Sequence, residues 1–111
     1  MKTLLPSLKE KQRYVVFEID RNVDKGAAKN DIERELLEFL GELTYGKAGI
    51  QMIPERFNGK KGIIRTDVKY VNEVKMGIGL VREIGNQKVK VQSIGVSGTM
   101  KKAEIKFMEV D

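Results

Sequence analysis

The sequence predicts an α+β fold with the element order β-α-β-β-α-β, and three observations support this prediction. Residues 13–20 are rich in aromatic and β-branched side chains and contain no breaker, which is typical of a buried strand. Within residues 30–46 and 66–85, apolar side chains recur at steps of three and four, as on one face of a helix. Asn58-Gly59 is a strong hairpin signal between two further strand candidates. A length of 111 residues suits one domain with one core.

The first predicted helix begins at Asn30, because Asn30 and Glu33 have the spacing of a capping box. Gly46 is expected to end it. Its apolar side consists of Ile32, Leu36, Leu37, Leu40 and Leu43. The next strand candidate, residues 48–57, contains Pro54, which has no N–H for a ladder hydrogen bond. This strand therefore belongs at an edge of the sheet.

A third strand is expected at residues 61–66, and Thr66 or Asp67 can act as the N-cap of a second helix. The pattern of this helix continues until Gly85-Asn86. Alternating Lys and Val predict a half-buried fourth strand over residues 88–96. Thr99 is expected to cap a short terminal helix that reaches about Met108.

This order predicts a ferredoxin-like, RRM-like sandwich with an antiparallel sheet and a short C-terminal helix, in which strands one and three are central. We divide the chain into a basic N-terminal arm (1–12), an RRM-like domain (13–97) and a C-terminal helix and tail (98–111). No segment has the length of a signal peptide's apolar region or of a membrane span, so a cytoplasmic protein is expected.

The charge is unevenly distributed along the chain. The net charge of +5 divides into +3 over residues 1–14, −4 over residues 15–45 and +6 over residues 46–111. A basic excess is typical of proteins that bind nucleic acids, and here it would come from the arm and the C-terminal half. The alternative is that scattered lysines only keep the surface soluble.

Several kinds of site find no support in the composition. The chain contains no cysteine and no histidine, which removes disulfides, thiolate zinc sites and the commonest general base. Gly77-Ile-Gly79 lies inside a helical pattern and has Arg82 in place of a third glycine, so close helix packing explains it better than dinucleotide binding. No catalytic or metal-ligating residue is expected.

Two features could contact RNA phosphates. If Val15 faces the helices, the open sheet face presents Tyr14, Val16 and Glu18. Tyr14 is the only aromatic residue of these three, so contact with phosphates or with a protein is favoured over base stacking. Gly95-Val-Ser-Gly-Thr99, followed by lysines, could seat a phosphate at a helix start, and an ordinary helix cap explains the same residues equally well.

The chain resembles the archaeal ribonuclease P protein component 2 family, the Pop-type subunit shared with eukaryotes. The resemblance spans almost the whole chain and rests on motifs that occur in order: Leu5-Pro6-Ser7-Leu8, Arg13-Tyr14, Gly62-Ile63-Ile64-Arg65 and Gly95-Val-Ser-Gly-Thr99. It implies a non-catalytic subunit of the endoribonuclease that removes the 5′ leader from precursor tRNA. The cofactor would be Mg²⁺ on the catalytic RNA, with none bound by the protein.

The same resemblance implies three partners: ribonuclease P RNA, precursor tRNA in the holoenzyme and a TIM-barrel-like protein subunit. It also implies a homodimer or a two-plus-two assembly as possible oligomers. The RNA-binding residues that we expect are Lys9, Lys11, Arg13, Tyr14, Lys61, Arg65, Ser97, Gly98, Thr99, Lys101 and Lys102. The alternative is a stand-alone ferredoxin-like module that binds a small anionic ligand.

Overall fold

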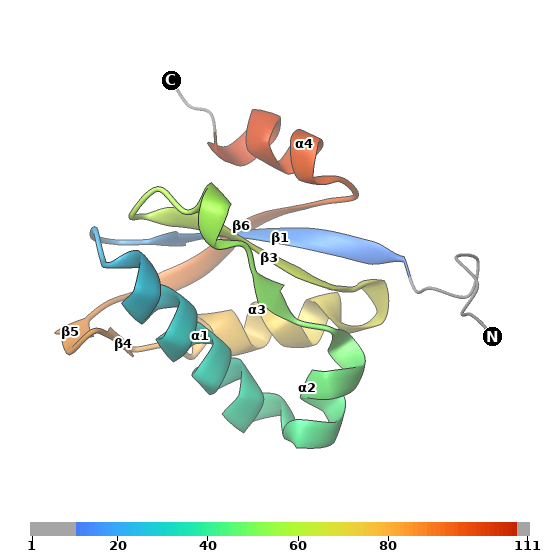
Figure 1. Cartoon of the computed structure of the whole chain (residues 1–111), viewed down its shortest axis with the longest axis horizontal. Coiled ribbons are helices and arrows are strands. Elements are labelled where there is room, and N and C mark those ends of the chain that lie inside the picture. The colour runs from blue at the N-terminus through green and yellow to red at the C-terminus, as the bar shows by residue number, and fades with distance from the viewer. Residues whose placement is uncertain (1–10, 109–111) are drawn as a thin grey trace.

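The computed structural model describes residues 11–108 and arranges them in three layers (Figure 1). A four-stranded antiparallel sheet in the order β2-β3-β1-β6 has α1, α2 and α3 on one side and α4 on the other. The strands are β1 (Gln12–Ile19), β2 (Gln51–Met52), β3 (Lys61–Asp67) and β6 (Val91–Ser97), and the helices are α1 (Lys25–Leu40), α2 (Glu42–Ala48), α3 (Val71–Gly79) and α4 (Met100–Ala103). The predicted fold class and the central places of β1 and β3 are confirmed.

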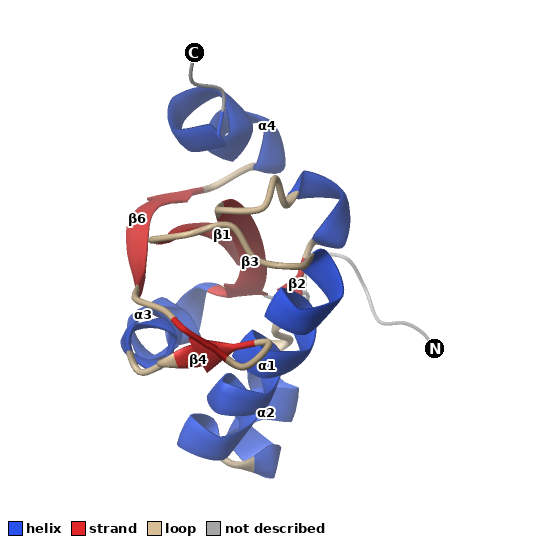
Figure 2. Ribbon diagram, turned by 90° about the vertical axis from the view of Figure 1, so that its left-hand side faces the viewer, coloured by secondary structure: helices blue, strands red, loops and turns tan. Residues whose placement is uncertain are grey.

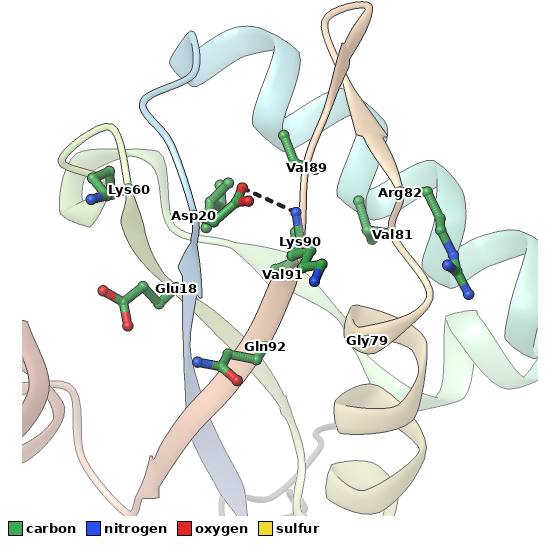
Figure 3. Close-up of a pocket in the computed structure, with 11 residues that line it drawn as sticks. Glu18, Asp20, Lys60, Gly79, Val81, Arg82, Val89, Lys90, Val91 and Gln92 are labelled. Carbon is green, nitrogen blue, oxygen red and sulfur yellow. Dashed lines mark hydrogen bonds between the residues drawn. The ribbon is translucent and has the colours of Figure 1, made fainter.

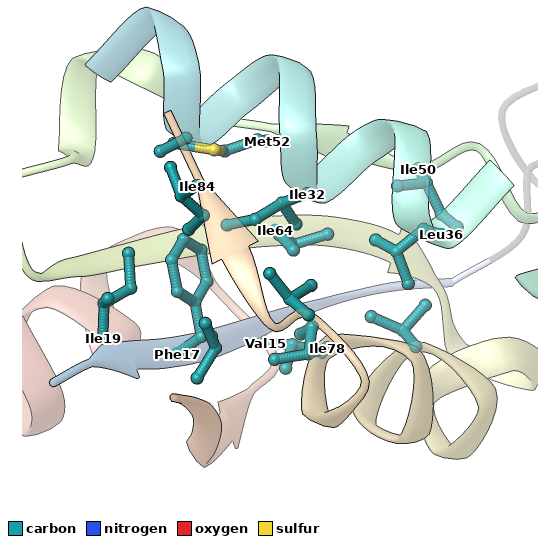
Figure 4. Close-up of a cluster of buried hydrophobic side chains, with 14 of the residues drawn as sticks. Val15, Phe17, Ile19, Ile32, Leu36, Ile50, Met52, Ile64, Ile78 and Ile84 are labelled. Atoms are coloured by element: carbon teal, nitrogen blue, oxygen red, sulfur yellow. The ribbon is translucent and has the colours of Figure 1, made fainter. Parts of the chain in front are cut away.

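The main core lies between the sheet and helices α1 and α3 (Figure 4). Alternate residues of β1 point into it, as expected for a strand with one face towards helices. Its largest fully buried members include Phe17, Ile32, Leu36, Ile64 and Ile78. Each such side chain contributes roughly 1.5–3 kcal/mol through burial, so this layer supplies most of the hydrophobic stabilisation of the domain.

The N-cap of helix α1 lies six residues earlier than the sequence pattern predicts. Asp24 is its N-cap, and the Asp24 carboxylate accepts a hydrogen bond from the Ala27 N–H at 3.0 Å. Asn30, the predicted cap, lies exposed within the helix. The prediction was wrong because both Asp24 and Asn30 have side chains that can cap a helix. Ala28 is buried and extends the apolar side of the helix by one turn towards Asp24, so the helix starts there.

The end of α1 also differs from the prediction. Gly41, with a φ of 84°, ends α1, and the chain continues directly into α2. Gly46, the predicted stop, lies inside α2, and the left-handed residue that ends this second helix is Gly49, with a φ of 61°. The apolar pattern is continuous across Gly41, so the break could not be recognised from periodicity alone.

Strand β2 lies at the sheet edge as predicted but is only two residues long, much shorter than the predicted 48–57. Pro54 begins a short 3₁₀ turn, Pro54–Arg56, which carries the chain away from the sheet. One oxygen of the Glu33 carboxylate accepts hydrogen bonds from the Met52 N–H at 2.9 Å and from Lys29 Nζ at 2.8 Å. Glu33 therefore attaches the edge strand to α1, which is a tertiary role and not the predicted capping role.

Helix α3 ends at Gly79, well before the predicted stop. Asp67 caps the short 3₁₀ turn that precedes α3, and its carboxylate accepts from the Lys69 N–H at 2.8 Å. After α3 the chain forms a two-stranded hairpin, β4 (Glu83–Ile84) and β5 (Gln87–Lys88). Gly85 and Asn86 both have positive φ angles, 56° and 68°, as in the two-residue turn of a tight hairpin.

The hairpin was missed because Ile84 continues the helical spacing of the residues before it. Ile84 is fully buried in the main core, so its apolar character reflects packing of the hairpin rather than a longer helix. The Asp31 carboxylate of α1 accepts from the Gly85 N–H at 2.8 Å and holds the turn in place. Gly77 packs as predicted, because a Cβ there would lie 2.5 Å from Leu36 Cδ2.

Strand β6 occupies residues 91–97. It begins three residues later than predicted, because residues 87 and 88 belong to the hairpin. Its register with β1 shifts between the pairs Val16–Gly95 and Phe17–Ser93, so Ile94 is an extra residue in a bulge. Ile94 packs in a second apolar cluster on the sheet face opposite to α1.

The C-terminal helix, predicted from Thr99, is confirmed, and it continues through a π-helical turn, Glu104–Met108. It covers the middle of the sheet face that the sequence suggested would be open (Figure 2). Val16 and Ile63 are fully buried beneath it, together with Ala103. The prediction that Val16 lies on an open face was therefore wrong, because the strand pattern does not reveal what covers the second face.

Two polar contacts hold this helix over the sheet. Lys61 Nζ donates to the Phe107 carbonyl oxygen at 3.0 Å, and Arg56 forms an ion pair with Glu104. The Phe107 ring lies directly over Gly95, where a side chain on the strand would collide with it. Gly95 is thus required by packing of the C-terminal segment.

Candidate nucleic-acid interface

The part of the outer sheet face beyond α4 contains an open groove with a volume of about 660 Å³. It is lined by Gln12, Tyr14, Lys47, Ala48, Gly49, Arg65, Asp67 and Gly98. The antiparallel register brings these residues together, because Tyr14 pairs with Arg65 on β3 and with Ser97 on β6. The end of α2 supplies Lys47 at the rim. Three residues of the expected RNA-binding set, Tyr14, Arg65 and Gly98, therefore line one groove.

Arg65 is the most informative side chain in the groove. One of its terminal nitrogens, Nη2, donates to Gln51 Oε1, whereas its Nε is buried and has no hydrogen-bond partner within residues 11–108. An unsatisfied buried donor costs about 1–3 kcal/mol. An anion that accepted from this guanidinium would therefore restore a missing hydrogen bond and also gain from its positive charge.

Tyr14 presents the aromatic surface of the groove. Its ring is half-buried, lies on the outer face of β1 and packs at the margin of the cluster beneath α4. Tyr14 and Arg65 are directly opposite each other in the register. A tyrosine beside an arginine can hold a nucleotide through one stacking contact and one phosphate contact, which is less than the aromatic pair of a typical RNA recognition module provides.

The structure separates Arg13 and Lys61 from the groove. Arg13 alternates with Tyr14 and therefore points to the helix side of β1, where its Nη1 donates to the Gln12 carbonyl oxygen at 2.9 Å. Lys61 lies on the outer face, but its ammonium group is used in the contact with Phe107. Lys9 lies outside the described residues, and Lys11 is exposed just before β1.

The Gly-Val-Ser-Gly-Thr turn forms the start of α4. The Thr99 hydroxyl accepts a hydrogen bond from the Lys102 N–H at 3.1 Å, and Ser97 is buried. Of the two interpretations left open by the sequence, the structure gives direct geometric support to the helix cap. Lys101 and Lys102 are exposed in the first turn of α4, where they add positive charge on the outer side of the sheet.

Replacing Thr99 with Ala is expected to lower the free energy of unfolding by about 1 kcal/mol, because the cap hydrogen bond is removed. Urea denaturation followed by circular dichroism measures this change. Ser97→Ala is the matched control, since it removes a hydroxyl from the same turn without removing the cap. An unchanged Thr99→Ala protein would mean that this cap does not stabilise the helix.

The sequence interpretation missed five of the residues that line the groove, namely Gln12, Lys47, Ala48, Gly49 and Asp67. Lys47 was assigned to a segment after the first helix, and no pattern in the sequence indicates that α2 ends beside β3. Gln51 reaches Arg65 only because β2 pairs with β3 in this register. Gln12 and Asp67 lie opposite each other in the β1–β3 register, and the place of Gln51 depends on the pairing of the edge strand.

A second groove, with a volume of about 560 Å³, lies at the other end of β1 (Figure 3). It mixes acids and bases, among them Glu18, Asp20, Lys60, Arg82 and Lys90. Asp20 Oδ1 accepts from the Lys90 N–H at 3.1 Å and so serves the backbone. Within residues 11–108, no group of three or more acidic side chains is placed to hold a metal ion.

Among the described residues, no helix is long and apolar enough to cross a membrane. The fold and the groove define an α+β protein of ferredoxin-like topology that carries on its sheet a groove lined by Arg65, Lys47 and Asp67, and an additional helix over the sheet centre. The chain belongs to the Rpp14/Pop5 family, whose sequence model matches residues 13–108.

Curated relatives agree with this family assignment. The chain is 37% identical over 112 residues to the ribonuclease P protein component 2 of Methanocaldococcus jannaschii, covering 99% of this chain and 82% of the relative. It is 36% identical over 110 residues to the protein of the same name from Pyrococcus horikoshii, covering 97% of this chain and 92% of the relative. A chain in the structure of yeast ribonuclease MRP has the same fold, with a TM-score of 0.65, 13% identity and coverage of 99% of this chain and 83% of that chain.

Proposed function

We propose that this chain is a protein subunit of ribonuclease P and that it supports the catalytic RNA in removing the 5′ leader from precursor tRNA. The observation that carries the proposal is the near full-length similarity to relatives named ribonuclease P protein component 2. Chemistry would be carried out by Mg²⁺ on the RNA, and the chain would supply no catalytic residue. Its site of action would be the cytoplasm.

The chain's contribution would be electrostatic. Arg65 and Lys47 border the groove, and the exposed Lys11, Lys101 and Lys102 extend positive charge along the outer side of the sheet. Cations held at fixed positions neutralise phosphates and release counterions, so the RNA would fold at a lower magnesium concentration. Arg65 is the expected anchor, because its planar fork matches phosphate oxygens. Gly98 and Tyr14 would shape the surface on which the RNA lies.

The helix side of the molecule carries both acids and bases, with Lys25 and Lys75 exposed on α1 and α3. Helix α1 and the start of α2 carry the exposed carboxylates Glu38 and Glu42, with the half-buried Glu35 nearby. These carboxylates repel phosphates locally, which favours an orientation with the sheet towards RNA. This division supports the assignment of partners, with ribonuclease P RNA and precursor tRNA on the sheet side. The helix side would then be available to a TIM-barrel-like protein subunit, within a two-plus-two assembly.

The alternative function, a stand-alone module for a small anionic ligand, depended on the Gly-Val-Ser-Gly-Thr turn. The Thr99 hydroxyl is already used by the helix cap, and Ser97 is buried. No specific feature of that turn therefore favours a small anion over the RNA backbone.

Reconstitution tests the proposal. Ribonuclease P RNA and the TIM-barrel-like subunit are combined with or without the full chain, and leader removal is measured across a magnesium titration. Addition of the chain is expected to lower the magnesium concentration needed for half-maximal activity. Cleavage of precursor tRNA by the chain alone, or an unchanged magnesium requirement, would contradict the proposed function.

A further inference from the structure

Two cross-strand pairs stand side by side on the part of the outer sheet face beyond α4. Gln12 lies opposite Asp67, Tyr14 lies opposite Arg65, and all four residues line the groove described above. Alternate residues of a strand share a face, so the two pairs are about 7 Å apart along the sheet. The groove therefore brings an amide, a carboxylate, an aromatic ring and a guanidinium within reach of one small ligand.

Asp67 is the residue of this group that phosphate binding leaves unexplained. It is only 5% exposed, and one oxygen of its carboxylate, Oδ1, accepts a hydrogen bond from the Lys69 N–H at 2.8 Å. Within residues 11–108, the other oxygen accepts no hydrogen bond and no ion pair joins Asp67 to a cation. A carboxylate repels phosphate, so this one suits a ligand that also presents N–H donors.

Arg65 supplies the complementary group. Its Nε has no hydrogen-bond partner within residues 11–108, although Asp67 lies two residues further along the same strand face. The groove thus offers an unused donor and an unused acceptor close together. A nucleotide matches both, because its phosphate accepts hydrogen bonds and the edge of its base donates them. Inorganic phosphate would satisfy Arg65 alone and would be repelled by Asp67.

The groove has room for a base beside Tyr14. Gly49 and Gly98 contribute to its lining without side chains, and a Cβ at either position would meet nothing within 4 Å. The volume of about 660 Å³ lies within the range of small-molecule sites, roughly 300–1,000 Å³. The half-buried Tyr14 ring offers a surface on which any base can stack, so the ring alone does not select among the four bases.

The carboxylate of Asp67 does distinguish between the bases. A carboxylate has about four acceptor positions, so the bond from the Lys69 N–H leaves room for two more. On its Watson–Crick edge guanine presents two neighbouring donors, N1–H and N2–H. Adenine and cytosine present one amino group beside an acceptor nitrogen, and uracil presents one N–H between two carbonyl oxygens that a carboxylate repels. Guanine is therefore favoured, and its edge is free only where the nucleotide is unpaired.

We propose that the groove binds one unpaired guanosine nucleotide of an RNA, with the base stacked on Tyr14, its N1–H and N2–H donated to Asp67 and its phosphate held by Arg65. The inference rests on the proposed function for the choice of RNA as the partner. It extends that function, because contacts to phosphates carry no sequence information, whereas one base-reading contact fixes the register of the chain on the RNA.

Fluorescence anisotropy with labelled single-stranded pentanucleotides tests the proposal on the full, unaltered chain. UUGUU is expected to bind on the order of tenfold more tightly than UUUUU, the discrimination typical of one bidentate contact to a base. UUAUU, which also has a purine for stacking, should bind more weakly than UUGUU. Inosine in place of the guanosine lacks the N2 amino group, so its affinity should lie between those for UUGUU and UUUUU.

Asp67→Asn tests the residue itself. The amide keeps the size of the side chain and an oxygen for the Lys69 N–H, and it replaces the second carboxylate oxygen by a donor. The preference for UUGUU over UUUUU should fall towards one, whereas the affinity for UUUUU should not fall, because a negative charge near the phosphates is removed.

Asp20→Asn is the matched control. Asp20 Oδ1 likewise accepts from a backbone N–H, that of Lys90 at 3.1 Å, but Asp20 lines the groove at the other end of β1 (Figure 3). This variant changes the net charge by the same amount as Asp67→Asn. It should leave the preference for UUGUU unchanged.

Equal affinities for UUGUU and UUUUU, inosine as effective as guanosine, or an unchanged preference in Asp67→Asn would overturn the proposal. Binding of guanosine monophosphate as tight as that of UUGUU would also overturn it, since the groove would then be a site for a free nucleotide. Gel shifts with ribonuclease P RNA are run in parallel. A chain that binds this RNA but shows no base preference refutes this inference alone, whereas a chain that does not bind it counts against the proposed function.

Discussion

Arg65→Glu is expected to weaken binding of the full chain to ribonuclease P RNA by roughly tenfold or more at low salt, because a charge-assisted hydrogen bond contributes about 1.5–3 kcal/mol. The reversed charge would also repel the neighbouring phosphates. The slope of log affinity against log salt should become shallower by about 0.7–0.9 for each phosphate that the variant no longer neutralises. Filter binding at a series of salt concentrations measures both quantities.

Two further variants make this prediction specific to the groove. Lys25→Glu changes the net charge by the same amount at an exposed position in the first turn of α1, where a carboxylate is compatible with the helix dipole, and it should have little effect. Arg65→Lys keeps the charge but removes the planar fork, so its affinity should be intermediate. If Arg65→Glu reconstituted full activity at low magnesium, the groove would not be the surface that binds RNA.

Gly95→Val is expected to lower the free energy of unfolding by about 1–3 kcal/mol, the usual cost of overpacking. The added side chain would occupy the space of the Phe107 ring, so the C-terminal helix would lift from Val16 and Ile63. Urea denaturation measures the decrease in stability. Trypsin should also cleave faster at Lys101 and Lys102 in this variant, because the segment that carries them is no longer held.

Gly98→Ala is the matched control for this experiment, since a Cβ at Gly98 meets nothing within 4 Å. It should leave stability and proteolysis almost unchanged. In the background of Phe107→Ala the collision partner is absent, so Gly95→Val should cost much less than it does in the wild-type chain. Equal costs in the two backgrounds would show that the Phe107 ring does not rest on Gly95.

The topology could be predicted because each of its determinants is local. The alternation in β1, the helical stripes, Pro54 at the edge and the Asn58-Gly59 turn all reflect backbone preferences and one-sided burial. In the turn, the Asn58 side-chain oxygen accepts from the Lys60 and Lys61 N–H groups, and Gly59 has a φ of 103°. Element boundaries were less predictable, since several residues could cap or end the same helix.

The candidate site was only partly predictable. Tyr14 and Arg65 were identified from the arrangement of the strands, and they do lie opposite each other. Arg13 was grouped with them because it is basic and adjacent, but strand alternation places it on the other face. Lys61 was included for its charge, and its ammonium group donates one hydrogen bond to the Phe107 carbonyl oxygen. Charge alone does not indicate whether a side chain already has a partner.

The sequence by itself determined the β-α-β-β-α-β order of the main elements, the central place of β1 and β3, and the separation of acidic from basic segments. These properties depend on side-chain pattern and composition, which are readable along the chain. Only the tertiary structure decided that α4 covers the sheet, that Lys47 and Gln51 join Arg65, and that Phe39 meets α3 at Gly77. Each of these depends on contacts between residues far apart in sequence, where packing geometry selects one neighbour among many of similar chemistry.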